Sequence, residues 1–161
     1  MPDRINTPTS VIAEVHGAQD KQEGTADGAI DIGTGVVTYK DADGNWRVRQ
    51  ASANEDTARV AREARDPPMS LGSVGESPLD DGYAADDHAF TVGGRSFDKF
   101  RVRLSTNASA DPIDSLVGWD ENGHASDDTI NGTDPVDTFV ARGIEVIERT
   151  DEDDLLLIEV L

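Results

Sequence analysis

The chain of 161 residues has no cysteine and few aromatic residues. Without cysteine it can form no disulfide and has no thiolate to act as nucleophile or metal ligand. Aromatic residues make up 5% of the chain, with two Trp, two Tyr and four Phe, so a core must be built from Val, Ile, Leu and Ala. Such thin cores often depend on partner subunits for part of their burial.

Basic residues are also scarce. Three Lys and 11 Arg stand against 33 acidic residues, and the formal net charge is −19. Binding to phosphate needs a basic face, so we expect no direct contact with nucleic acid or with an anionic membrane. No run approaches 18 apolar residues, so no segment that spans a bilayer is predicted. The first residues lack the basic and apolar regions of a secretion signal, so none is predicted there.

The acidic residues follow a pattern. Asp outnumbers Glu by 23 to 10, and the acids are spread over the whole length between apolar runs. Acid-rich, Lys-poor surfaces suit molar salt, where screening acts over about 3 Å and like charges repel little. The pattern therefore predicts a halophilic source. The alternative is an ordinary acidic or partly disordered chain, but disorder would gather the acids into blocks and remove the β-branched runs.

Short apolar runs separated by turn residues predict an all-β fold. Asp43-Gly44 lies between Val36–Lys40 and Trp46–Gln50, which is a strong signal for a β-hairpin. Further runs follow at short intervals, at most one helix fits, and no βαβ rhythm is present. We expect a small antiparallel β-barrel or sandwich with long loops. The runs predicted as strands include Ala29–Gly33, Ala89–Val92, Ser96–Leu104 and Leu116–Trp119.

The last stretch, Asp137–Leu161, predicts an antiparallel pair around an acidic connector. Leu155–Leu161 is apolar on both faces except at Glu159, which is typical of a central or intersubunit strand. We therefore expect Leu156, Ile158 and Val160 to be buried.

Two regions are less regular. Residues 1–28 are predicted as an N-terminal arm with at most one short strand at Val11–Val15, ahead of a single β-domain at 29–161. Arg59–Arg65 has two possible structures. Asn54 as N-cap and the many Ala residues favour a helix, whereas the absence of a wide apolar stripe favours a strand.

In Ser96–Leu104, alternation predicts that Phe100, Val102 and Leu104 face inward and that Lys99, Arg101 and Arg103 face outward.

No motif predicts a metal site. His16, His88 and His124 lie in separate regions without a partner at helical or strand spacing, so we expect surface histidines. Asp41–Asn45 resembles the start of a calcium loop, but its glycine comes too early and its twelfth position is Ser52, so a hairpin turn explains it better. The carboxylate clusters Asp86–His88 and Asp151–Asp154 are interpreted as solvated edges.

No motif predicts catalysis or a cofactor either. The chain has no Gly-x-Ser-x-Gly elbow, and Gly33-Thr-Gly35 is too short to be a dinucleotide fingerprint. We therefore predict no catalytic, cofactor-binding or metal-binding residue, and a protein that is not an enzyme.

Five segments between Ile30 and Leu161 form a recognisable set. They are Gly35–Tyr39 with Asp43-Gly44, Val60–Pro68, Tyr83–Asp87 followed by Phe90–Val92, Leu116–Gly123, and Val140–Gly143 leading into Glu145. Together these segments resemble the capsid decoration (cement) proteins of tailed viruses, particularly those that infect haloarchaea. Where such proteins carry a phrase like Tyr-Ala-Ala-Gly-Asp, this chain has Asp86 in place of the glycine.

The resemblance implies a compact β-domain on the outer surface of a virion, commonly a homotrimer, bound to the major capsid protein. It also implies an N-terminal arm that reaches neighbours and a strand at Arg59–Arg65. Each copy would bridge several shell subunits, so that repeated weak contacts stabilise the shell. It carries over no catalytic residue.

Two other functions remain open. One is a tail, baseplate or cell-surface binding module of a halophile that recognises glycan, which a large groove lined by Trp46 and Trp119 would favour. The other is a small all-β enzyme, which would require the histidines to converge with carboxylates.

Overall fold

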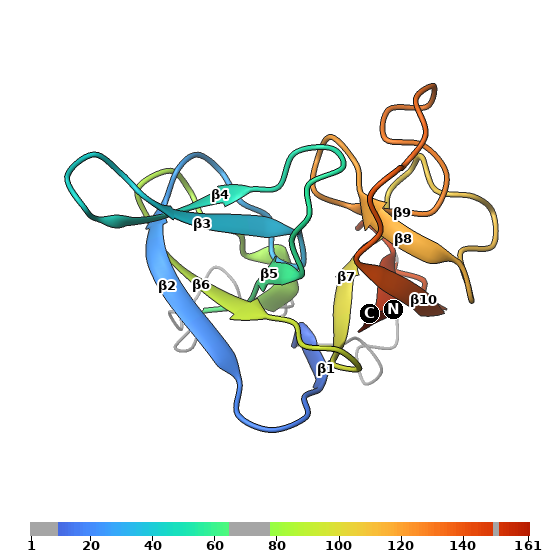
Figure 1. The fold of residues 1–161 in the computed structure, drawn as a ribbon, viewed down its shortest axis with the longest axis horizontal. Helices are drawn as coiled ribbons and strands as arrows, with labels where there is room; N and C mark the ends of the chain where they lie inside the picture. Colours follow the sequence, from blue (N-terminus) through green and yellow to red (C-terminus); the bar gives the residue numbers. More distant parts are fainter. Residues whose placement is uncertain (1–9, 65–77, 150–151) are drawn as a thin grey trace.

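The computed structural model describes residues 10–64, 78–149 and 152–161. These residues form eleven β-strands and one 3₁₀ helix, η2 (Pro78–Asp80), arranged as two sheets (Figure 1). The described residues contain no α-helix, and therefore none that could cross a membrane. The predicted all-β fold is confirmed.

The first sheet has six strands, and every neighbouring pair in it is antiparallel. Its centre is formed by β11 (Leu155–Val160), which pairs with β10 (Ala141–Ile147) on one side and β7 (Lys99–Arg103) on the other. The outer strands are β1 (Ile12–Glu14), β8 (Leu116–Trp119) and β9 (Ala125–Ser126). The central position predicted for the last strand is thus confirmed, as is the burial of Leu156, Ile158 and Val160.

The second sheet has five strands and curls so far that its edges meet. Its order is β3 (Val36–Lys40), β4 (Trp46–Gln50), β2 (Asp20–Ala26), β6 (His88–Gly93) and β5 (Arg59–Ala61). Just before β3, Gly35 bridges to Val60, and the Ala61 N–H donates to the Thr34 carbonyl at 3.0 Å. The sheet therefore comes close to a closed barrel, which leaves little exposed strand edge.

The predicted β3–β4 hairpin is confirmed, with Val36 opposite Gln50 and Lys40 opposite Trp46. The β2–β4 pair is parallel and short, joining only Thr25 to Arg47 and Ala26 to Val48. This parallel pair was not expected from the sequence. The ladder between the two strands contains no pair on the N-terminal side of Thr25 and Arg47.

Part of the predicted N-terminal arm is built into the fold. Most of the polar run at Gln19–Gly24 belongs to β2, which pairs with β6 from Asp20 to Thr25. The short strand predicted near Val11–Val15 is present as β1, and Val11 is fully buried. Backbone pairing on both sides stabilises β2 despite its polar side chains. Residues 1–9 lie outside the described part of the chain.

The ambiguous segment forms a strand. β5 covers Arg59–Ala61, so the helix alternative is wrong for these residues, while Arg65 lies outside the described part. Val60 is fully buried and pairs with Val92, which a one-turn helix would not allow. Asn54 does not cap a helix. Its Oδ1 accepts the N–H groups of Asp137 (2.9 Å) and Thr138 (3.4 Å).

The two sheets share one hydrophobic core. Trp119, on β8 of the first sheet, is 1% exposed and donates its indole N–H to the Thr57 carbonyl at 2.7 Å. Its ring packs so closely against Gly35 that a Cβ there would lie 2.5 Å from a ring carbon. The largest side chain of the core therefore joins the two sheets.

Candidate functional site

The three histidines are separated in the structure. His16 pairs with Glu14 at 3.1 Å and His88 with Glu23 at 2.9 Å, and all four side chains are more than 40% exposed. His124 lies in the β8–β9 turn, where its backbone N–H donates to Asp120. No group of three or more His, Asp or Glu residues within the described ranges could hold a metal ion. The convergence that would favour an enzyme is therefore not found in this part of the chain.

The calcium-like segment is a hairpin turn, as predicted. Oδ1 of Asp41 accepts the N–H groups of Asp43 at 3.0 Å and Asn45 at 2.9 Å, and Gly44 has φ 82°. These backbone donors lower the pKa of Asp41, with a smaller contribution from Arg47. The carboxylate is thus used to hold the turn, and a calcium ion would have to compete with those bonds.

The β8–β9 turn has the same geometry, but its aspartate is buried. Oδ1 of Asp120 accepts the N–H groups of Asn122 and His124, at 2.8 and 2.9 Å, and Gly123 has φ 70°. The other oxygen, Oδ2, accepts the Ser105 hydroxyl at 2.5 Å. Ser, Asp and His thus come together here. However, His124 contributes its backbone rather than its ring, so the group is a turn and not a catalytic triad.

The carboxylate clusters also have structural partners. Asp87 caps a turn by accepting the Ala84 N–H at 2.8 Å, and Asp154 accepts the Arg149 N–H at 2.9 Å. Asp86, which stands where the decoration proteins have glycine, has φ 69°. That left-handed conformation is the one glycine adopts most easily, so Asp86 occupies a backbone position that would suit a glycine.

One group of charged residues is buried, contrary to expectation. Arg103 was predicted to face outward, but its side chain is only 6% exposed. It donates to the Ile32 and Leu79 carbonyls at 2.8 and 2.7 Å, and to Asp153 at 3.0 Å. Beside it, Arg149 pairs with Asp80 at 2.8 Å. The two arginines link η2 to the first sheet, so we interpret the cluster as structural.

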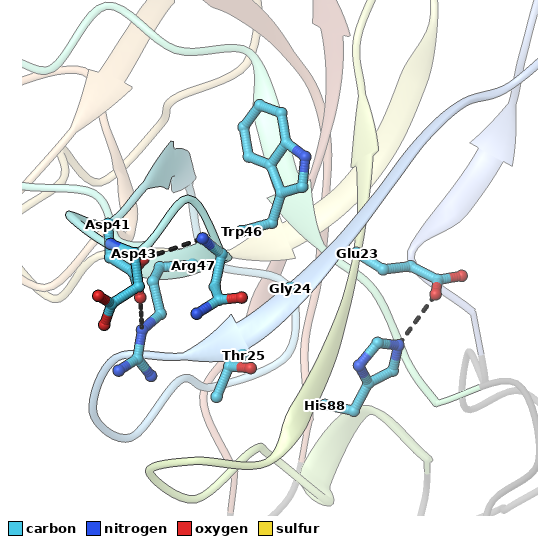
Figure 2. A pocket seen from close by; sticks show the side chains of 9 residues that line it. Glu23, Gly24, Thr25, Asp41, Asp43, Trp46, Arg47 and His88 are labelled. Carbon is cyan, nitrogen blue, oxygen red and sulfur yellow. Dashed lines mark hydrogen bonds and ion pairs between the residues drawn. The ribbon is translucent and has the colours of Figure 1, made fainter.

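The two tryptophans do not form a common groove, since Trp119 is in the core. Trp46 is 43% exposed and lines a cavity of about 480 Å³ (Figure 2). The cavity lies between β2, the β3–β4 turn and the start of β6. Its lining residues are Glu23, Gly24, Thr25, Asp41, Asp43, Asn45, Trp46, Arg47 and His88.

Sequence reasoning did not identify this cavity as a site. Glu23, Gly24 and Thr25 come from β2, which was predicted to belong to the N-terminal arm, and the strand pairing that brings β2 to β4 is parallel and nonlocal. Only the exposed tryptophan after an Asp-Gly turn could have signalled it.

Comparison with known proteins supports the fold and gives no family. No family model matches the sequence, and no curated protein matches it. Among solved structures, the N-terminal base of the head fiber protein gp8.5 of bacteriophage phi29 is similar, with a TM-score of 0.54 and 11% sequence identity. The match covers 89% of this chain and 95% of that chain. The chain therefore has the same overall fold as the base of a phage head fiber.

Proposed function

We propose that the protein is a structural component of a virus head that decorates the outer surface of the capsid of a halophilic tailed virus. The observation that carries the proposal is the fold, which is similar over nearly the whole chain to the base of a phage head fiber. The sequence resemblance to decoration proteins supports the same class independently, because it was based on turn and strand motifs rather than on the fold.

The organisation of the chain also supports a structural role. Within the described residues, Asp41 and Asp120 hold turns and Asp153 pairs with arginine, and no contact joins a carboxylate to both a histidine ring and a serine hydroxyl. Six large apolar side chains remain 40–65% exposed, which suits a chain that buries further surface against sister subunits and shell proteins. They are Trp46, Phe97, Ile113, Leu116, Phe139 and Leu161.

The proposed partner is the major capsid protein, and the proposed assembly is a homotrimer. Each contact would be weak, and repetition over the lattice would supply the stability. The net charge of −19 would keep such a protein soluble in molar salt before it binds the shell.

The test is co-sedimentation with capsids in molar KCl. Shells assembled from the major capsid protein of the same genome are mixed with the purified chain and separated on a density gradient, and light scattering gives the oligomeric state of the free chain. We expect the chain to bind the shells saturably, with a number of bound copies per shell that is a multiple of three. Decorated shells should remain intact at a higher temperature than bare shells. An equally acidic protein of similar size serves as control. A monomer that does not sediment with the shells would refute the proposal.

A further inference from the structure

The turn between β6 and β7 holds a bulky residue at a backbone position that suits glycine. Phe97 has φ 73°, and the Asp98 N–H closes the turn by donating to the Arg95 carbonyl at 3.0 Å. On the facing strand, the Val160 carbonyl accepts the Phe97 N–H at 2.8 Å, and the Val160 N–H donates to the Asp98 carbonyl at 2.9 Å. Two residues thus face one, which is the pattern of a G1 β-bulge, whose first residue is normally glycine.

Phe97 gains little within the chain from this position. A positive φ brings the Cβ of a bulky residue close to the following carbonyl group, so the conformation is strained. The Phe97 side chain is 65% exposed, so burial does not offset the strain, and its ring stacks on no other aromatic ring in the described ranges. Strained residues of this kind are typical of functional sites.

A second exposed apolar residue, Leu161, lies beside it. The Leu161 carbonyl accepts the Ser96 hydroxyl at 2.8 Å, and the Leu161 side chain is 56% exposed. On its other side, the Leu161 N–H donates to the Val140 carbonyl at 3.2 Å, and the preceding residue, Phe139, is 40% exposed. Three exposed apolar residues therefore come from neighbouring segments at one end of the first sheet. We call Phe97, Phe139 and Leu161 the Phe97 patch.

A row of charged side chains next to the patch carries no net charge. It crosses four neighbouring strands with alternating sign, and it starts two residues from Phe97 and from Leu161. Ion pairs of 3.3 and 3.0 Å link its members, and the turn adds Arg95, which is exposed and forms no ion pair with a described residue. The row is Glu14, Lys99, Glu159 and Arg142. It therefore lacks the excess of negative charge found in the chain as a whole, where 33 acidic residues stand against 14 basic ones.

This balance of charge favours a second copy of the chain as the partner. Copies with a net charge of −19 each repel one another wherever their acidic surfaces approach. Molar salt screens charges that are more than about 3 Å apart, but not charges in direct contact. Copies can therefore join most favourably through a surface that is apolar and bordered by equal numbers of opposite charges.

We propose that copies of this chain associate through the Phe97 patch, with Phe97 as the anchor that packs against the same patch of the neighbouring copy. The proposal rests on the homotrimer proposed above for the number of copies, and not on binding to capsids. It explains the strain, because the turn holds the ring outside the domain, where association can bury it. Three side chains make a small contact, so we expect a Kd on the order of 100 µM.

The test measures the mass of the full-length chain by sedimentation equilibrium in molar KCl, between about 5 µM and about 1 mM. We expect the mean mass to rise from one chain towards three. In ¹H–¹⁵N spectra over the same range, the amide shifts that change should centre on residues 95–99, 139–142 and 161. The variants Phe97→Gly and Leu161→Ser should each raise the Kd of association about tenfold or more. Phe97→Gly should fold, since glycine suits φ 73°, and in dilute solution, where the chain is monomeric, it should be the more stable protein.

Trp46→Ala is the matched control, because it removes an exposed aromatic side chain from the other sheet and should leave association unchanged. A chain that stays monomeric over the whole range would overturn the proposal. So would association that Phe97→Gly leaves unchanged, or that Trp46→Ala weakens as strongly. Association that persists in Phe97→Gly while sedimentation with capsids is lost would assign the patch to the shell protein instead. Binding of the unaltered chain to shells is measured separately, so the two proposals fail separately.

Discussion

Replacing Arg103 by Met tests whether the buried charges hold η2 against the first sheet. Met keeps the apolar stem of the side chain and removes the guanidinium, so little cavity is formed. The change leaves the carbonyls of Ile32 and Leu79 without this donor, and it removes an ion pair of 3.0 Å with Asp153.

The expected cost follows from these contacts. A hydrogen bond from a charged group contributes about 1.5–3 kcal/mol, and breaking a buried ion pair costs about 3–5 kcal/mol. The side chain of Asp153 is 41% exposed, so water can solvate its stranded charge, which lowers the total. We therefore expect the free energy of unfolding to fall by about 3–4 kcal/mol, a large part of the 5–15 kcal/mol typical of a domain.

Urea unfolding in molar KCl measures this change, because urea leaves the ionic strength constant. Lys99→Met is the control on the same strand. Lys99 pairs with Glu14 at 3.3 Å near the surface, so its loss should cost about 1 kcal/mol or less. A cost for Arg103→Met no larger than that of Lys99→Met would show that the buried cluster does not stabilise the fold.

Four further predictions concern the core, two backbone positions and pH. Leu156→Ala, in the central strand, should cost about 2–5 kcal/mol in the same urea assay. Gly118→Ala should prevent folding, seen as loss of near-ultraviolet dichroism, because its Cβ would lie 2.0 Å from the Thr138 carbonyl oxygen. Phe97→Gly should raise stability by about 1 kcal/mol, because Phe97 has φ 73° and is 65% exposed; an unchanged midpoint would contradict this. Burial raises the pKa of Tyr83 from 10.0 to about 12, so the folded state retains the phenol proton longer than the unfolded state. The contribution of Tyr83 to stability should be constant below pH 10 and fall between pH 10 and 12, by up to about 2.7 kcal/mol, and Tyr83→Phe should remove that part of the alkaline slope.

Local sequence patterns predicted the elements that form between residues close together in the sequence. The β3–β4 hairpin follows from an Asp-Gly turn between two β-prone runs, and the antiparallel β10–β11 pair from two apolar runs around an acidic connector. In β7, Phe100 and Val102 alternate inward as predicted. In each case the residues that form the element lie within a few positions of one another.

The sequence could not predict features that depend on distant partners. β2 is polar, and only its pairing with β6 and β4 makes it a strand. Arg103 fits the outward side of an alternating strand. It can be buried only because the Ile32 and Leu79 carbonyls and Asp153, which lie 24 to 71 positions away, satisfy its donors. The candidate cavity was missed for the same reason, since it lies between β2 and strands that pair with it nonlocally.

The small number of aromatic residues explains how this core is packed. With few large side chains to fill space, the strands approach one another through their backbones, and glycine is needed where they do. Gly118 lies against the Thr138 carbonyl, and Gly35 lies flat against the ring of Trp119. Trp119 can then contact both sheets, because Gly35, which lies against its ring, has no side chain. Trp46, by contrast, is 43% exposed at the start of β4 and takes no part in this packing.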